Sequence, residues 1–160
     1  MMPAWLPELC ETCGRQDEVL ARLHAVFQHD FASNALFIDG SPVWFDRRLV
    51  GRYEESFLHL VTRTDYRTGE RLLDPRRAER LAWCGAIVRH CDDPVIRRWR
   101  FKEGSGRVHL YVWYEEGDYV VVLEERLMRR GRVYFLVTAY HVDGDATRRR
   151  LRAKYEKKEP

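Results

Sequence analysis

The spacing of apolar residues predicts helices in the first part of the chain and at its end. Apolar side chains recur every three or four positions in residues 17–31 and again in residues 53–63, which is typical of amphipathic helices. An Asp-Pro pair at Asp74 predicts the start of a third helix, which runs to about residue 91. Residues 143–158 predict a basic helix with few apolar anchors.

Alternation of apolar and polar residues predicts strands between these helices. Residues 35–47 predict a β-hairpin, because two short apolar runs flank the turn dipeptide Asp39-Gly40. After residue 94 the hydrophobic period changes from the helical to the strand value, and short polar turns separate the apolar runs. Short links without an intervening helix favour an antiparallel meander. The four strands of this meander are expected at residues 95–101, 108–114, 119–126 and 132–140.

Together these elements predict an α+β fold, with helices packed on one four-stranded antiparallel meander sheet. The N-terminal helix and β-hairpin precede the sheet, and the basic C-terminal helix follows it. A length of 160 residues fits a single domain, 1–160, with residues 1–34 as a helical extension and 35–157 as the core. Because no apolar run approaches the ~20 residues that cross a bilayer, and the first residues lack a secretory signal, we expect no membrane association and a cytoplasmic location.

The net charge of +3 conceals an uneven distribution along the chain. Residues 1–46 contain seven acids and two bases, a net charge of −5, so the remainder carries +8. Most of these bases are arginines, whose planar fork matches phosphate oxygens. The acidic N-terminal part either covers the basic body or forms an ordinary surface of solvated charges.

Two cysteines near the start of the chain have the spacing of a metal or redox pair. Cys10 and Cys13 are followed by His24 and His29, in loose imitation of a zinc finger. Both histidines fall inside the predicted helix 17–31, and the interval from Cys13 to His24 is shorter than in zinc fingers. Local packing of reduced thiols, or a surface turn, is therefore preferred to a zinc-stabilised interaction module.

Candidate catalytic groups occur at three distant places. In the helix 53–63, His59 and Arg63 are four residues apart and are expected to project together. Thr138 and Tyr140 share one face of the last strand, and a run of basic residues starts at Arg148. An imidazole, a phenol and several guanidiniums are the groups needed for metal-free RNA cleavage, which requires a base, an acid and fixed cations.

Each candidate also has an ordinary structural explanation. From its pattern alone, a histidine such as His59 is more often a helix-surface or core residue than a catalytic one. Residues 148–152 fit a solvated helix face as well as a track for phosphates. The aromatic residues Trp44, Trp99 and Trp113 could stack on bases, although strand aromatics pack in cores by default. Motifs for a metalloprotease, a P-loop or a serine hydrolase are absent from the sequence.

The chain resembles phage-borne and prophage-borne members of the barnase/colicin/RelE-like superfamily of metal-independent ribonuclease toxins. The resemblance extends over about residues 35–157 and includes the hairpin PVWFDRR at 42–48. It is carried mainly by FLHLVTR (57–63), DPRRAERLAW (74–83), HLYVWYEEGDYVVVLEER (109–126) and YFLVTAYHVDGDATRRRLRAKYE (134–156).

This resemblance implies a cofactor-free endoribonuclease that cleaves tRNA or mRNA by 2′-OH attack. It also implies a toxin or phage-conflict role, with a cognate antitoxin or immunity protein as a further partner. The alternative is a non-catalytic RNA-binding or interaction protein that keeps the same fold. The residues expected to be catalytic are His59, Arg63, Thr138, Tyr140 and Arg148, and those expected to bind RNA are Arg47, Arg48, Arg149 and Arg152.

Overall fold

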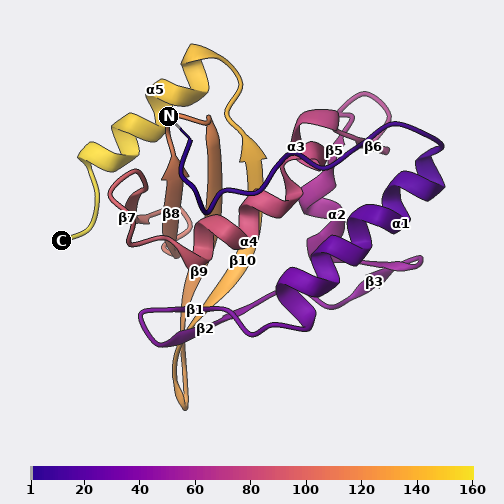
Figure 1. The fold of residues 1–160 in the computed structure, drawn as a ribbon. Coiled ribbons are helices and arrows are strands. Elements are labelled where there is room, and N and C mark those ends of the chain that lie inside the picture. Colours follow the sequence, from indigo (N-terminus) through magenta and orange to yellow (C-terminus); the bar gives the residue numbers. More distant parts are fainter. Residues whose placement is uncertain (1) are drawn as a thin grey trace.

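The computed structural model describes residues 2–160, and its main feature is a six-stranded sheet with helices on both faces (Figure 1). The strands follow the order β1-β2-β10-β9-β8-β7 across the sheet. The last four in the chain form an antiparallel meander, as the alternation of apolar residues predicts. These strands are β7 (Arg97–Lys102), β8 (Val108–Tyr114), β9 (Tyr119–Met128) and β10 (Gly131–His141).

The expectation of a four-stranded sheet is incomplete, because the early hairpin joins the meander. Strands β1 (Phe37–Ile38) and β2 (Ser41–Trp44) form the predicted hairpin, and Asp39 and Gly40 take the positive φ angles of its tight turn, 50° and 81°. Strand β2 then pairs in parallel with β10, at Tyr134 and Phe135. This pairing satisfies backbone groups at the edge of β10 and has no local signature in the sequence.

The helices largely follow the predicted segments but differ in their limits. The first continues α1 into a π-helical turn, the second is shorter than expected, and the third is interrupted at Arg80. Segments on either side of the second helix form two small hairpins instead of helix or loop. The helices are α1 (Gln16–Phe27), η1 (Gln28–Ala32), α2 (Glu55–Val61), α3 (Pro75–Glu79), α4 (Leu81–Arg89) and α5 (Gly144–Glu156). The small hairpins pair β3 (Leu49–Val50) with β4 (Tyr53–Glu54), and β5 (Thr62–Thr64) with β6 (Arg71–Leu73).

Two apolar cores lie on opposite faces of the sheet. On one face, alternate strand residues such as Val112 and Val121 pack with α1, α2 and α4. On the other face, Trp113 and Val120 pack with Leu151 of α5. The period-two pattern of the strands is therefore apolar on both sides, as expected for central strands that are covered twice.

An irregular segment, residues 2–15, runs along the helical layer (Figure 1). The Trp5 indole donates to Asp93 at 2.8 Å and stacks on the His90 ring. The Trp83 indole donates to the Pro7 carbonyl oxygen at 2.9 Å. This start of the chain is thus held by specific contacts on α4 and the segment after it. Within residues 2–160, no helix combines the length and the apolar character needed to cross a membrane.

Candidate active site around Glu55 and His59

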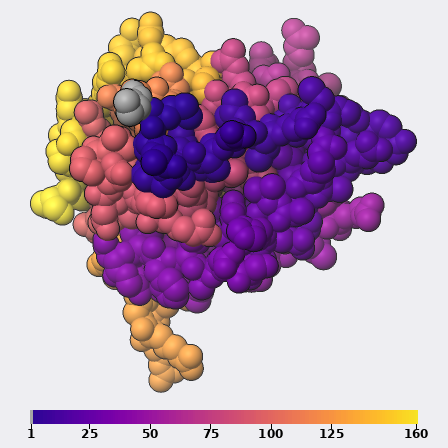
Figure 2. All heavy atoms as spheres, in the orientation of Figure 1, coloured from indigo at the N-terminus to yellow at the C-terminus, as the bar shows by residue number. Residues whose placement is uncertain are grey.

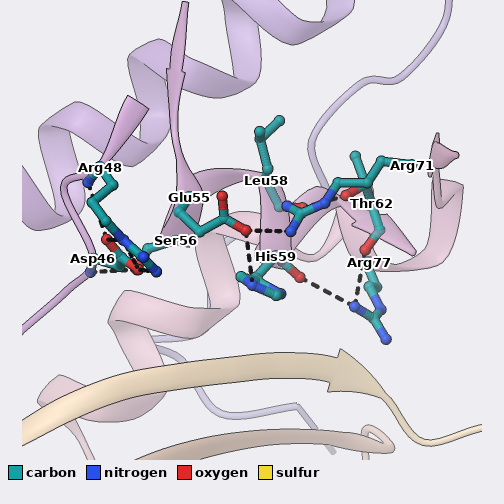
Figure 3. Close-up of polar contacts among 9 residues, drawn as sticks. All are labelled: Asp46, Arg48, Glu55, Ser56, Leu58, His59, Thr62, Arg71 and Arg77. Carbon is teal, nitrogen blue, oxygen red and sulfur yellow. Dashed lines mark hydrogen bonds and ion pairs between the residues drawn. The ribbon is translucent and has the colours of Figure 1, made fainter. Parts of the chain in front are cut away.

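Helix α2 presents His59 on its exposed side. Phe57, Leu60 and Val61 are fully buried in the core beneath the helix, which fixes its orientation. His59 lies on the other side, and 45% of its side chain is exposed. Figure 3 shows the imidazole projecting from α2 toward the neighbouring strand, with Glu55 on the same side of the helix. The amphipathic pattern of the sequence thus correctly leaves His59 outside the core.

Glu55 contacts His59, and it is not among the site residues that the sequence predicts. Its Oε1 atom lies 3.3 Å from His59 Nε2, one helical turn away. The same carboxylate forms an ion pair with the Arg71 guanidinium, which comes from β6 (Figure 3). The signal that could have identified Glu55 is its i,i+4 spacing to His59. Three chemically different groups, a carboxylate, an imidazole and a guanidinium, therefore meet on this surface.

The surroundings of His59 favour the neutral imidazole. Partial burial of the ring lowers its pKa below the usual value, and the nearby Arg71 and Arg77 guanidiniums lower it further. Glu55 raises the pKa, with an effect that is smaller than that of Arg71 and larger than that of Arg77. At neutral pH the ring is therefore mainly uncharged and able to accept a proton.

Arg77 connects this site to the last strand. Asp74 caps the start of α3 by accepting from the backbone amides of Arg76 and Arg77, at 3.1 and 3.3 Å. From α3, Arg77 Nη1 donates to the carbonyl oxygens of His59 and Thr62, at 3.1 and 2.9 Å (Figure 3). A cation at these carbonyls compensates the end of the α2 dipole. The same guanidinium lies 5.8 Å from the centre of the Tyr140 ring.

The structure separates Arg63 from His59. Helix α2 ends at Val61, so Arg63 belongs to strand β5 rather than to the next helical turn. In the β5–β6 pairing, Arg71 lies opposite Thr64, and Arg63 lies opposite Leu72. Since successive strand residues point to opposite faces, Arg63 points away from the side on which Arg71 contacts Glu55. Arg71 thus takes the place that the helical spacing predicts for Arg63.

Thr138 and Tyr140 share the sheet face that α5 covers. They lie opposite Val122 and Val120 of β9, which belong to the second core. Tyr140 lines a hollow of about 300 Å³ between the sheet and α5. Burial raises the pKa of the Tyr140 phenol, so it stays protonated at neutral pH. Besides Tyr140, the hollow is lined by Tyr111, His141, Asp143, Thr147, Arg150, Leu151 and Lys154.

Arg148, the first residue of the basic run, forms ion pairs with two carboxylates of the chain. Its guanidinium donates to Asp118 at 2.8 Å and to Asp145 at 2.8 Å, which ties α5 to the turn between β8 and β9. Arg152 lies 3.4 Å from Glu115 in the same turn, whereas Arg149 is exposed. Arg150, which belongs to the predicted basic run 148–152, is the arginine that lines the hollow with Tyr140.

The two arginines after the early hairpin also have partners within the chain. Arg48 forms a two-pronged ion pair with Asp46, whose carboxylate is mostly buried. The Arg47 guanidinium lies 4.4 Å from the centre of the Phe45 ring. Both side chains are exposed beyond these contacts, next to the start of α2.

The cysteine pair has no ligand set around it. Cys10 is partly buried against the first core and donates its backbone amide to the Glu79 carbonyl, whereas Cys13 is exposed. His24 is 2.6 Å from Glu54 and packs against Phe57. Among residues 2–160, no group of three or more His, Cys, Asp or Glu side chains is arranged to hold a metal ion. The partial burial of Cys10 fits local packing, and the exposure of Cys13 fits a surface turn.

Comparisons with protein-family models, with curated proteins and with solved structures find no match for the chain. An assignment of function therefore depends on the geometry and the chemistry of the site residues.

Proposed function

We propose that the protein is a metal-independent endoribonuclease in which His59 acts as the general base. The observation that carries this proposal is the 3.3 Å contact between Glu55 and an exposed, predominantly neutral His59, with Arg71 and Arg77 beside them. RNA is the substrate that suits such a site, because its own 2′-hydroxyl is the nucleophile and no metal-activated water is required. The resemblance of residues 35–157 to ribonuclease toxins supports the same class.

Glu55 orients the base. A proton on Nε2 of the neutral ring faces the Glu55 carboxylate, which leaves the lone pair of Nδ1 for the incoming proton. Nδ1 removes the proton of the 2′-hydroxyl while the 2′-oxygen attacks phosphorus and the bond to the 5′-oxygen breaks. The products are a 2′,3′-cyclic phosphate and a 5′-hydroxyl.

Tyr140 and Arg77 supply the other two functions in this proposal. The leaving 5′-oxygen needs a proton, and the protonated Tyr140 phenol is the donor that we assign. Tyr140 belongs to the α5 side of the sheet, and Arg77, whose guanidinium is 5.8 Å from the Tyr140 ring, is the residue that links it to the His59 side. The proton that His59 has collected then returns to the phenolate through solvent. Arg77, whose guanidinium contacts the His59 carbonyl and lies near the Tyr140 ring, stabilises negative charge on the phosphorane. Arg63 and Arg148 have no catalytic role in this proposal. Thr138 contacts the substrate on the side where Tyr140 lies.

The test is cleavage of total RNA by the purified protein in the presence of EDTA. We expect cleavage to survive the chelator, to leave 2′,3′-cyclic phosphate ends, and to fall by about 100-fold or more in His59→Ala. His29→Ala is the matched control, because His29 is a solvent-exposed histidine on η1 and is not part of this site. Circular dichroism confirms that both variants fold.

Two results would contradict the proposal. Equal cleavage by His59→Ala and the unaltered protein removes His59 from the reaction. Salt-sensitive RNA binding without cleavage by the unaltered protein identifies the non-catalytic RNA-binding alternative.

A further inference from the structure

One half of the sheet face that α5 covers is left open by residues 2–160. Helix α5 packs its Leu151 on Trp99, Trp113 and their neighbours, at the end of the sheet where β8 and β9 are joined. Toward the other end, β2 adds Trp44 directly beside Phe135 of β10. Trp44 is 46% exposed, although strand tryptophans are usually buried.

The turn between β9 and β10 extends this open half beyond the body of the protein. Figures 1 and 2 show the hairpin protruding past β1 and β2. Leu127 and Met128, at the end of β9, are 78% and 45% exposed. Between the hairpin and β2 lies a hollow of about 430 Å³, which is large enough for a nucleobase. Its lining comprises Pro42, Trp44, Met128, Arg129, Arg130, Gly131, Arg132 and Val133.

Positive charge surrounds the hollow. Arg129 and Arg130 are exposed at the turn itself. Farther along β9, the Arg126 guanidinium lies 4.0 Å from the centre of the Phe135 ring. Three of the surrounding arginines are already paired with carboxylates: Arg126 and Arg107 hold Glu124, at 2.8 and 3.2 Å, and Arg132, which lines the hollow, lies 3.3 Å from Glu125. An anionic partner therefore meets Arg129 and Arg130, which form no ion pair with any of residues 2–160, beside exposed aromatic and apolar surface.

We propose that this open sheet face binds single-stranded nucleic acid, with one base stacked on Trp44 in the hollow and adjacent phosphates on Arg129 and Arg130. A single strand supplies both a flat aromatic surface and closely spaced phosphates, which match the two kinds of group present here. A duplex hides its base faces, and a run of acidic side chains supplies charge without a planar ring, so neither satisfies both. The site deepens the proposed function by naming the form of the substrate, an unpaired RNA strand, but it does not depend on cleavage.

The experiment uses a fluorescein-labelled oligodeoxythymidine of about 12 nucleotides, a length that a site of this kind accommodates. DNA lacks the 2′-hydroxyl and cannot be cleaved by the proposed reaction, so binding is measured separately from catalysis. Fluorescence anisotropy gives Kd at several salt concentrations, and quenching of intrinsic tryptophan fluorescence reports stacking.

We expect Trp44→Ala to raise Kd by about 5- to 100-fold, and Trp44→Phe to raise it less, because a smaller ring still stacks. The double variant Arg129→Ala/Arg130→Ala is expected to flatten the dependence of log K on log salt by about 1.4, since two phosphate contacts are lost. The matched control is Arg52→Ala/Arg67→Ala, which removes two exposed arginines from the turns of the small hairpins. It should bind like the unaltered protein.

Three outcomes would overturn the proposal: an unchanged Kd in Trp44→Ala, an equal loss of binding in the control pair, or equally strong binding of a duplex of the same length. Failure of RNA cleavage, in contrast, leaves this binding site standing and affects only the proposed function. Circular dichroism confirms folding of each variant, and Trp44 is exposed enough for its replacement to be tolerated.

Discussion

At the scale of single residues, His59 shows how neighbours convert an ordinary histidine into a candidate base. Its ring is partly buried, and two guanidiniums on other elements lower its pKa while Glu55 acts against them. None of the guanidiniums is predictable from the α2 sequence, because Arg71 and Arg77 reach the site from β6 and α3. The charge state of His59 is therefore a property of three elements together.

The pKa of His59 should move in opposite directions in two variants. Arg71→Gln removes a cation that lowers this pKa, so the pKa should rise, whereas Glu55→Gln should lower it further. NMR titration of the His59 ring protons measures both shifts without reference to activity. If His59 is the base, it must be neutral to act, so the acid limb of kcat/KM should follow the same shifts. Shifts of the opposite sign would show that these charges do not control the ring.

Gly117 lies in the turn between β8 and β9, where there is no room for a larger side chain next to Tyr114 and Trp83. A Cβ atom at this position would overlap the buried Tyr114 ring and lie 3.1 Å from Trp83 Cζ3. Gly117→Ala should therefore lower the free energy of unfolding by about 1 to 3 kcal/mol in urea denaturation. Gly104→Ala is the control, because within the described residues nothing lies within 4 Å of its added Cβ. Equal midpoints for the two variants would contradict the overlap.

At the scale of elements, the sequence predicts the presence of a helix or strand better than its limits. Asp74 and the following proline start α3, as their chemistry indicates. The second helix ends at Val61, although its apolar pattern favours a longer one, because the chain turns into strand β5 and pairs with β6. Tertiary pairing thus overrides the local pattern, and it removes Arg63 from the His59 side.

The cap at Asp74 should contribute measurably to stability. Asp74→Ala leaves two backbone amides of α3 without their acceptor, so we expect a loss of about 1 kcal/mol in the free energy of unfolding. Asp143 is the matched control, since it precedes α5 without a side-chain capping bond to any described residue. Thermal or urea unfolding of the two alanine variants compares them. A loss in Asp143→Ala as large as that in Asp74→Ala would contradict this role of the cap.

At the scale of the whole molecule, one sheet separates two cores of different size. Helices α1, α2 and α4 cover one face, while α5 alone covers part of the other. The basic helix is therefore a structural cover as well as a carrier of charge. Its Arg148 serves this purpose too, because it ties the helix to Asp118 in the adjacent turn.

Leu151 should be the residue through which α5 stabilises the fold. It is 3% exposed in the second core, so Leu151→Ala should cost about 2 to 5 kcal/mol through lost burial and the cavity left behind. Leu127→Ala makes the same chemical change at a residue that is 78% exposed, and it should change stability little. Urea unfolding monitored by circular dichroism compares the pair. Similar losses in both variants would show that α5 does not seal this core.

The sequence by itself determined the meander, the hairpin turn at Asp39 and the exposed side of α2. Each of these depends on local periodicity or on turn chemistry, which are determined by residues close together in the sequence. The tertiary structure alone decided that β2 extends the sheet beside β10, that Arg71 rather than Arg63 meets Glu55 and His59, and that Arg148 is neutralised. Such contacts join segments far apart in the chain, and they form only where backbone pairing and charge neutralisation bring their partners within a few ångströms.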